Sequence, residues 1–123
     1  MSDHPLNGRR ILVVEDEYML ANDLCSSLGD AGAVVLGPIG TLENALKFVA
    51  EGAPFDVAIL DVNLGGEKVF PAADRLIERH VPMVFATGYD ASAIPSVYGD
   101  IPRCEKPVNM ATVTRALAGL IGR

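Results

Sequence analysis

The strongest constraint on the fold is a series of short, continuous apolar runs separated by stretches with a helical period. The runs show no alternation of apolar and polar residues, which is typical of strands that are buried on both faces. They are RILVV at 10–14, AVVLG at 33–37, VAIL at 57–60, MVFA at 83–86 and a brief run at 103–104. Strands of this kind indicate a parallel sheet whose neighbours are joined by right-handed crossovers.

The segments between these runs carry apolar residues three and four positions apart, as amphipathic helices do. The four stripes are Leu20, Leu24 and Leu28; Leu42, Ala45, Leu46 and Val49; Val69, Ala73, Leu76 and Ile77; and Val113, Leu117, Leu120 and Ile121. Thr41 and Asn109 are expected N-caps, and Pro71 fits only the first turn of its helix. Residues 90–100 have a poor stripe and contain Pro95, so any helix there should be short or mobile.

Five strand–helix units predict a doubly wound α/β domain with the flavodoxin-like strand order 2-1-3-4-5. The length of 123 residues suits one domain, which we expect over residues 9–123 after a short tail at 1–8. The net charge of −6 argues against nucleic acid or an anionic membrane as the main partner. We see no signal-peptide pattern and no apolar run near the ~20 residues of a membrane span, so we expect a cytoplasmic protein.

Polar and charged residues follow four of the predicted strands where these strands end. Glu15 and Asp16 follow the first strand, Asp61 ends the third, Thr87 ends the fourth, and Lys106 comes just after the fifth. The carboxyl ends of parallel strands share one edge of the sheet, where ligands gather at the switch point between strands 1 and 3. Three carboxylates, a hydroxyl and an ammonium should therefore converge on one shallow site.

This combination of groups is suited to phosphoryl transfer. Three neighbouring carboxylates repel one another, and a hard cation such as Mg²⁺ relieves the repulsion. Asp61, beside that cation and the Lys106 ammonium, would be a nucleophile, while the Thr87 hydroxyl could bind oxygens of the transferred group. Each residue alone has an ordinary explanation as a turn former, a helix-start acid or a solvated lysine. Their joint occurrence on one edge is less easily accidental.

Four strings, VVEDE, AILDVNL, FATGY and EKP, resemble the receiver domain of two-component response regulators over about residues 9–121. The resemblance implies that Asp61 is the phospho-acceptor. It also implies that Asp16 and Asp61 bind Mg²⁺ (or Mn²⁺) directly, with help from Glu15 and the backbone carbonyl of Asn63. FATGY is further similar to a subgroup with Thr-Gly-Tyr at this place, many of them stand-alone domains.

The same resemblance implies how the protein would work. Thr87 and Lys106 would contact the phosphoryl group, and the Lys106–Pro107 peptide bond would be cis. The phosphoryl donor would be a sensor histidine kinase or a histidine phosphotransfer protein. The protein would act through an unknown downstream protein or as a phosphate sink, and it would be no enzyme beyond its own phosphorylation and dephosphorylation.

Two positions depart from the pattern of many receivers. Gly65 stands where many carry proline, which we expect to loosen the loop after Asp61. Arg103 stands where many carry an aromatic switch residue, so the usual output mechanism is in doubt. Gly88 and Tyr89 are the substitute switch candidates. Our hypothesis is that residues 88–100 are mobile in the free protein and become more ordered on phosphorylation. The alternative is that Tyr89 only packs over the loop and has no switch role.

Three other functions fit the same fold. A flavin or dinucleotide protein is disfavoured because VVEDEYML presents acid, and no glycine, where a pyrophosphate would sit. A phosphohydrolase with an aspartyl nucleophile needs a general acid two residues after it, and Asn63 cannot serve as one. A pseudo-receiver that binds partners without phosphorylation is disfavoured by the complete set of residues, and only an assay can exclude it.

Overall fold

The apolar runs pair into one parallel sheet of five strands, in the order β2-β1-β3-β6-β7. This is the predicted order 2-1-3-4-5. The computed structural model describes residues 4–88 and 94–121. The five strands are β1 (Arg10–Val14), β2 (Val34–Ile39), β3 (Val57–Asp61), β6 (Met83–Thr87) and β7 (Arg103–Glu105).

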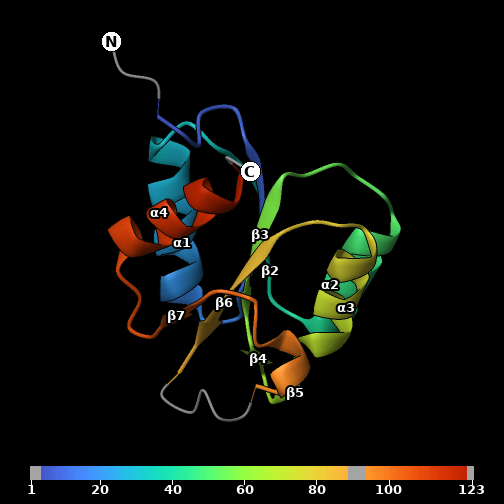
Figure 1. Ribbon diagram of the computed structural model, residues 1–123. Helices are drawn as coiled ribbons and strands as arrows, with labels where there is room; N and C mark the ends of the chain where they lie inside the picture. Colours follow the sequence, from blue (N-terminus) through green and yellow to red (C-terminus); the bar gives the residue numbers. More distant parts are fainter. Residues whose placement is uncertain (1–3, 89–93, 122–123) are drawn as a thin grey trace.

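Two helices cover each face of the sheet. Helices α1 and α4 lie on one face, and α2 and α3 lie on the other (Figure 1). Their bounds are α1 (Tyr18–Asp30), α2 (Leu42–Ala50), α3 (Phe70–Glu78) and α4 (Met110–Ile121). The predicted caps are confirmed, because Thr41 Oγ1 accepts from the Asn44 amide and Asn109 Oδ1 accepts from the Thr112 amide, both at 3.1 Å. Pro71 lies in the first turn of α3 as predicted.

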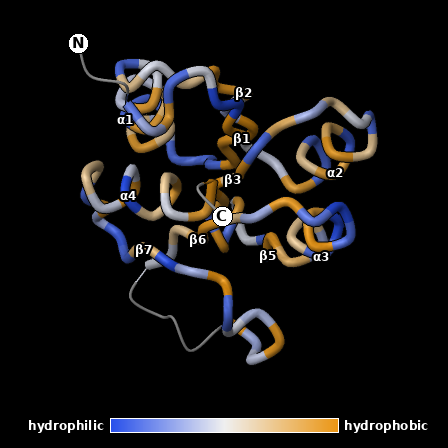
Figure 2. Tube along the Cα trace, turned by 45° about the horizontal axis from the view of Figure 1, so that its top comes forward, coloured by the Kyte–Doolittle hydropathy of each residue, from blue (hydrophilic) through white to orange (hydrophobic). Residues whose placement is uncertain are grey.

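Successive residues of the central strands alternate between two apolar cores. Ile11 and Val13 pack with α1 and α4, whereas Leu12 and Val14 pack with α2 and α3. The strands in the middle of the molecule are accordingly apolar along most of their length (Figure 2). The edge strand β2 is less buried than we expected, since Val34 is 44% exposed. An edge strand has only one neighbour, so burial on both faces holds for β1, β3 and β6 but not for β2.

A short 3-10 helix, η2 (Ser96–Tyr98), precedes β7 where the other crossovers have a longer helix. Within residues 94–100, the part of this segment that the structure describes, the helix is short, as expected. Its Tyr98 ring is buried, stacks on Phe70 at 4.8 Å between ring centroids, and donates its hydroxyl to Asp74 at 2.7 Å. Residues 89–93, which include Tyr89, lie outside the described residues, so the proposed ordering on phosphorylation stays a prediction.

A small antiparallel hairpin follows β3, and the sequence reasoning missed it. Strands β4 (Asn63–Leu64) and β5 (Glu67–Lys68) are joined by Gly65 and Gly66, whose φ angles are +56° and +94°. Glycine adopts these positive angles without a steric penalty, as a two-residue turn of this kind requires. The expectation that Gly65 loosens this loop is wrong, because the two glycines permit a hydrogen-bonded turn.

The segment expected to be an N-terminal tail is described from His4 onward. Its Leu6 is fully buried in the core beside α1 and α4, and the Gly8 amide donates to the Gly32 carbonyl at 2.8 Å. Within residues 4–88 and 94–121, no helix has both the length and the apolar character needed to cross a bilayer.

Candidate functional site

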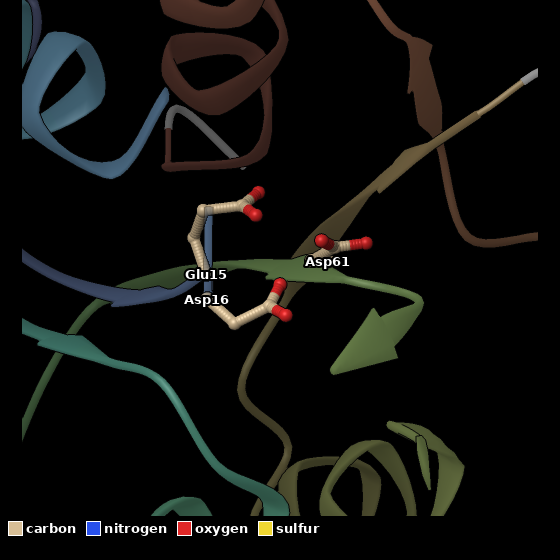
Figure 3. Close-up of side chains that lie close together, drawn as sticks. All are labelled: Glu15, Asp16 and Asp61. Carbon is tan, nitrogen blue, oxygen red and sulfur yellow. The ribbon is translucent and has the colours of Figure 1, made fainter. Parts of the chain in front are cut away.

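The ends of β1 and β3 bring three carboxylates together. Val14 pairs with Leu60 in the parallel ladder, so Glu15, Asp16 and Asp61 emerge side by side at the same edge. One oxygen from each acid lies within 4.8 Å of the others. Figure 3 shows the three side chains directed toward a common space. The predicted convergence of the acids is thus observed.

Asp61 is held by donors from two parts of the chain. Its side chain is buried, its Oδ1 accepts from the Asn63 amide at 3.0 Å, and its Oδ2 accepts from Lys106 Nζ at 2.7 Å. Burial on its own would lower the pKa of Lys106, but the hydrogen bond and charge of Asp61, with those of Glu15, outweigh burial and raise it. The Lys106–Pro107 bond is cis, as the resemblance implied.

Glu15 is the most deeply buried of the three acids, at 2% exposure. Its Oε2 accepts from the Glu17 amide at 3.0 Å and lies 3.4 Å from Lys106 Nζ. Its Oε1 is buried and finds no hydrogen-bond partner among the described residues. Burial, followed by the effect of the neighbouring Asp61 carboxyl group, raises the pKa of Glu15 to about 8.

These features fit a hard cation. The donor set consists of carboxylate oxygens, which Mg²⁺ prefers, and the buried Oε1 of Glu15 lacks the positive partner that a buried carboxylate oxygen needs. A cation among the three acids would satisfy that oxygen and remove the repulsion that favours protonation of Glu15. The residues present therefore fit the metal site that the sequence predicts, although their role as ligands stays a prediction.

Asp16 is exposed, and its Oδ2 accepts from the backbone amide of Gly65 at 2.9 Å. The sequence reasoning missed this donor. It also gave no role in the site to Glu17, whose Oε1 lies 3.9 Å from Lys106 Nζ. The pair Gly65-Gly66 was a turn signal that could have indicated the hairpin. No sequence pattern indicates that the Gly65 amide points toward Asp16.

Thr87 ends β6 at the same edge of the sheet. Asp61 pairs with Ala86 in the parallel ladder, and Thr87 is the next residue of β6 after Ala86. Thr87 is buried, and its hydroxyl donates to the Gly88 carbonyl at 3.3 Å. Gly88 is exposed, and Tyr89 lies outside the described residues. Arg103, at the place of the usual aromatic, is exposed.

An open groove with a volume of about 570 Å³ adjoins the site next to Lys106. Its lining is mostly apolar and comes from the start of α1, Gly88 and the segment that leads into α4. The residues are Glu17, Met19, Leu20, Asp23, Gly88, Lys106, Pro107, Val108 and Met110. Tyr18 and Met19, at the start of α1, are 82% and 73% exposed.

Comparison with known proteins identifies the family. The solution structure of SdrG from Sphingomonas melonis Fr1 is 42% identical, with a TM-score of 0.80, over 98% of this chain and 99% of that chain. The crystal structure of a response regulator receiver protein from Sinorhizobium medicae WSM419 is 26% identical, with a TM-score of 0.82, over 95% of this chain and 97% of that chain. The chain belongs to the receiver domains of response regulators. No family model matches it.

A curated relative agrees with this assignment. The sensory transduction protein LytT of Bacillus subtilis is 34% identical over 88 residues, which are 69% of this receiver and 36% of LytT. The receiver thus spans little more than a third of the length of that relative. The similarity concerns the shared domain, and it says nothing of the remainder of LytT.

Proposed function

We propose that this receiver accepts a phosphoryl group on Asp61, in a Mg²⁺-dependent reaction, from a sensor histidine kinase or a histidine phosphotransfer protein. One observation carries the proposal: the buried Asp61 carboxylate lies 2.7 Å from Lys106 Nζ and within 4.8 Å of the oxygens of two further acids. A structure described as the BeF3-activated conformation of SdrG, 41% identical to this chain, supports it. Beryllofluoride imitates a phosphoryl group on a carboxylate.

In the transfer, an oxygen of Asp61 bonds to phosphorus while the bond from phosphorus to the donor's histidine nitrogen breaks. The electron pair of the broken bond returns to the imidazole. The Asn63 amide and Lys106 hold the Asp61 carboxylate in a fixed orientation for this attack. Lys106 also stabilises negative charge on the transferred group, and the Thr87 hydroxyl is assigned to the same oxygens.

Glu15, Asp16 and Asp61 would hold the metal, with the backbone carbonyl of Asn63 as a further oxygen ligand. Bound Mg²⁺ would supply positive charge beside the oxygens of the transferred phosphoryl group. Without it, the raised pKa of Glu15 favours a proton at this place. The negative charge of the acids is therefore reduced by Mg²⁺ when the metal is bound and by a proton on Glu15 when it is not.

The phosphorus atom on the donor histidine must come within about 3–3.5 Å of an Asp61 oxygen, so the donor protein has to cover the surface around the site. The apolar groove next to Lys106 and the exposed Tyr18 and Met19 provide such a surface. We assign the donor's contact to this side. A kinase or phosphotransfer protein that buries these side chains would gain apolar contact area as it positions its histidine.

Output would occur by contact with a downstream protein or by draining phosphate from a shared kinase. Arg103 cannot supply an aromatic ring movement, so we keep Gly88 and Tyr89 as the switch candidates. Beyond its own phosphorylation and dephosphorylation, we propose no catalytic activity for this domain.

The proposal is tested by intact-mass measurement after incubation with Mg²⁺ and acetyl phosphate. Wild type should gain the mass of one phosphoryl group, and Asp61→Asn should not. Asp56→Asn is the matched control, because Asp56 is an exposed acid just before β3, at the other end of the strand from Asp61. Phosphorylation of Asp61→Asn at the wild-type yield would refute the acceptor assignment. Failure of the wild type with any donor would favour the pseudo-receiver.

A further inference from the structure

The hairpin that follows β3 lies directly against the metal-site acids. Its two-residue turn, Gly65-Gly66, has positive φ at both positions and connects β4 to β5. The Gly65 amide donates to Asp16 Oδ2 at 2.9 Å, and the Gly66 amide donates to Asn63 Oδ1 at 2.9 Å. The two amides of one turn therefore serve two different partners.

The hairpin is anchored in the core independently of this contact with Asp16. Leu64 in β4 is 2% exposed, and Val69, just after β5, is fully buried. The Val69 amide donates to the Val62 carbonyl at 2.9 Å, which closes the base of the hairpin. The Gly65 amide is thus presented from a fixed support, whereas Asp16 is an exposed side chain on a segment between β1 and α1.

From this arrangement we infer that the β4–β5 hairpin positions the metal ligand Asp16 through the Gly65 amide. The inference rests on the proposed Mg²⁺ site. A carboxylate has two oxygens, so an amide that holds Oδ2 restrains the orientation of the group and leaves the other oxygen for the cation. Gly65 is a positioning residue here, because its amide would act on the metal through Asp16.

Glycine fits this role, whereas proline does not. With φ at +56°, a proline at position 65 could not adopt the turn, and it would also lack the N–H that Asp16 accepts. A receiver with proline at this place must orient its equivalent acid by another contact. The departure from the common pattern at Gly65 therefore has a specific consequence for the metal site.

The first test measures amide hydrogen exchange by NMR in the metal-free protein. In Asp16→Ala, the Gly65 amide loses its acceptor, and its exchange should become about tenfold faster. The Gly66 amide is the internal control, because its acceptor is Asn63, and its exchange should not change. Equal exchange of Gly65 in the wild type and Asp16→Ala would overturn the inference, because the hydrogen bond would not exist in solution.

The second test replaces single amides by esters through chemical synthesis, which removes one N–H and leaves the side chains intact. The ester at Gly65 should raise the dissociation constant for Mg²⁺ roughly tenfold, the lower end of the effect of outer-shell partners. The matched ester at Gly66 should change it less than about twofold. Both esters should lower the metal-free thermal midpoint alike, since each removes one hydrogen bond of the same turn.

The outcomes separate the two proposals. If wild type binds Mg²⁺ and the two esters have equal affinity for it, the positioning role fails while the proposed function stands. If wild type itself shows no Mg²⁺ binding and no phosphorylation, the proposed function fails, and the positioning role fails with it. A Gly65 ester that loses stability without losing Mg²⁺ affinity also overturns the inference, because the amide would then be merely structural.

Discussion

Replacement of Lys106 by methionine tests the electrostatic balance of the site before any phosphate is added. Lys106 Nζ lies 2.7 Å from Asp61 and 3.4 Å from Glu15, and these two carboxylates are 4% and 2% exposed. Methionine keeps most of the side-chain length and removes the charge. Two buried acids would then lack their cation in the metal-free protein, so we expect Lys106→Met to be less stable than wild type.

The size of the effect follows from burial and from the remaining partners. Removing one partner of a buried ion pair costs about 3–5 kcal/mol. Here Lys106 is itself 23% exposed, Asp61 keeps the Asn63 amide, and Glu15 can take up a proton because its pKa is raised to about 8. We therefore expect a loss of about 2–3 kcal/mol in the free energy of unfolding. With an unfolding entropy of roughly 2.1 cal/mol/K per residue over 123 residues, the thermal midpoint should fall by about 8–12 °C.

The assay is thermal unfolding followed by circular dichroism in buffer with a chelator. Lys106→Met, Asp61→Asn and the double variant form a cycle that isolates the pair, and we expect a coupling of about 1–2 kcal/mol. Lys47→Met, on the exposed face of α2, is the matched control and should stay within about 0.5 kcal/mol of wild type. An unchanged midpoint in Lys106→Met, or an equal loss in the Asp61→Asn background, would refute the reasoning.

The pH dependence gives the same prediction a second readout. The pKa of Lys106 is raised above its ordinary 10.5, so the folded protein holds this proton more tightly than the unfolded chain. The stability that the pair contributes is then fully present below pH 10.5 and is lost as the pH rises through the folded-state pKa. The difference between wild type and Lys106→Met should shrink in that alkaline range.

Three further predictions concern the metal, the aromatic cluster and the N-terminal segment. Saturating Mg²⁺ at about 100 times its dissociation constant should stabilise wild type by about 2.7 kcal/mol in thermal unfolding, and Asp16→Ala should lose most of this gain. Tyr98→Phe should lose about 1 kcal/mol, because the hydroxyl's bond to Asp74 disappears while the ring stacking stays. The Asp74 hydrogen bond and burial raise the pKa of Tyr98 to about 12, so that contribution should be present below pH 10 and vanish as the pH approaches 12, as checked by tyrosinate absorbance. Leu6→Ala should cost about 2–4 kcal/mol in denaturant unfolding, and an unchanged midpoint would support the boundary at residue 9.

The fold and the acids could be predicted because they depend on patterns with a fixed period. Continuous apolar runs indicated buried parallel strands, and the topology of such a sheet makes the strands that end at Val14 and Asp61 neighbours. Glu15, Asp16 and Asp61 therefore lie close together whatever conformations the surrounding side chains adopt. Ile77 marks the limit of this reasoning: it fits the helical stripe of α3, yet it is 48% exposed, because the buried side of that short helix is completed by Ala72, Ala73 and Leu76.

The hairpin could not be predicted by period, because each of its strands has only two residues. A pattern of apolar and polar positions needs at least four residues to be read. Our expectation that Gly65 loosens the loop failed for a different reason. We considered glycine only as a source of flexibility, whereas its positive φ permits a tight turn that is fixed by hydrogen bonds on both sides.

The same distinction separates the acids of the site from their donors. Each acid meets a donor from a different place in the chain: the Glu17 amide for Glu15, the Gly65 amide for Asp16, and Lys106 for Asp61. The sheet topology determines where a strand-end acid lies, but the direction of an amide depends on local φ and ψ angles that the sequence does not display. Substitutions in the turn after β4, or in the segment after β1, would therefore alter the proposed metal and phosphoryl binding while every acid is retained. The presence of the three acids alone therefore does not determine how they are held.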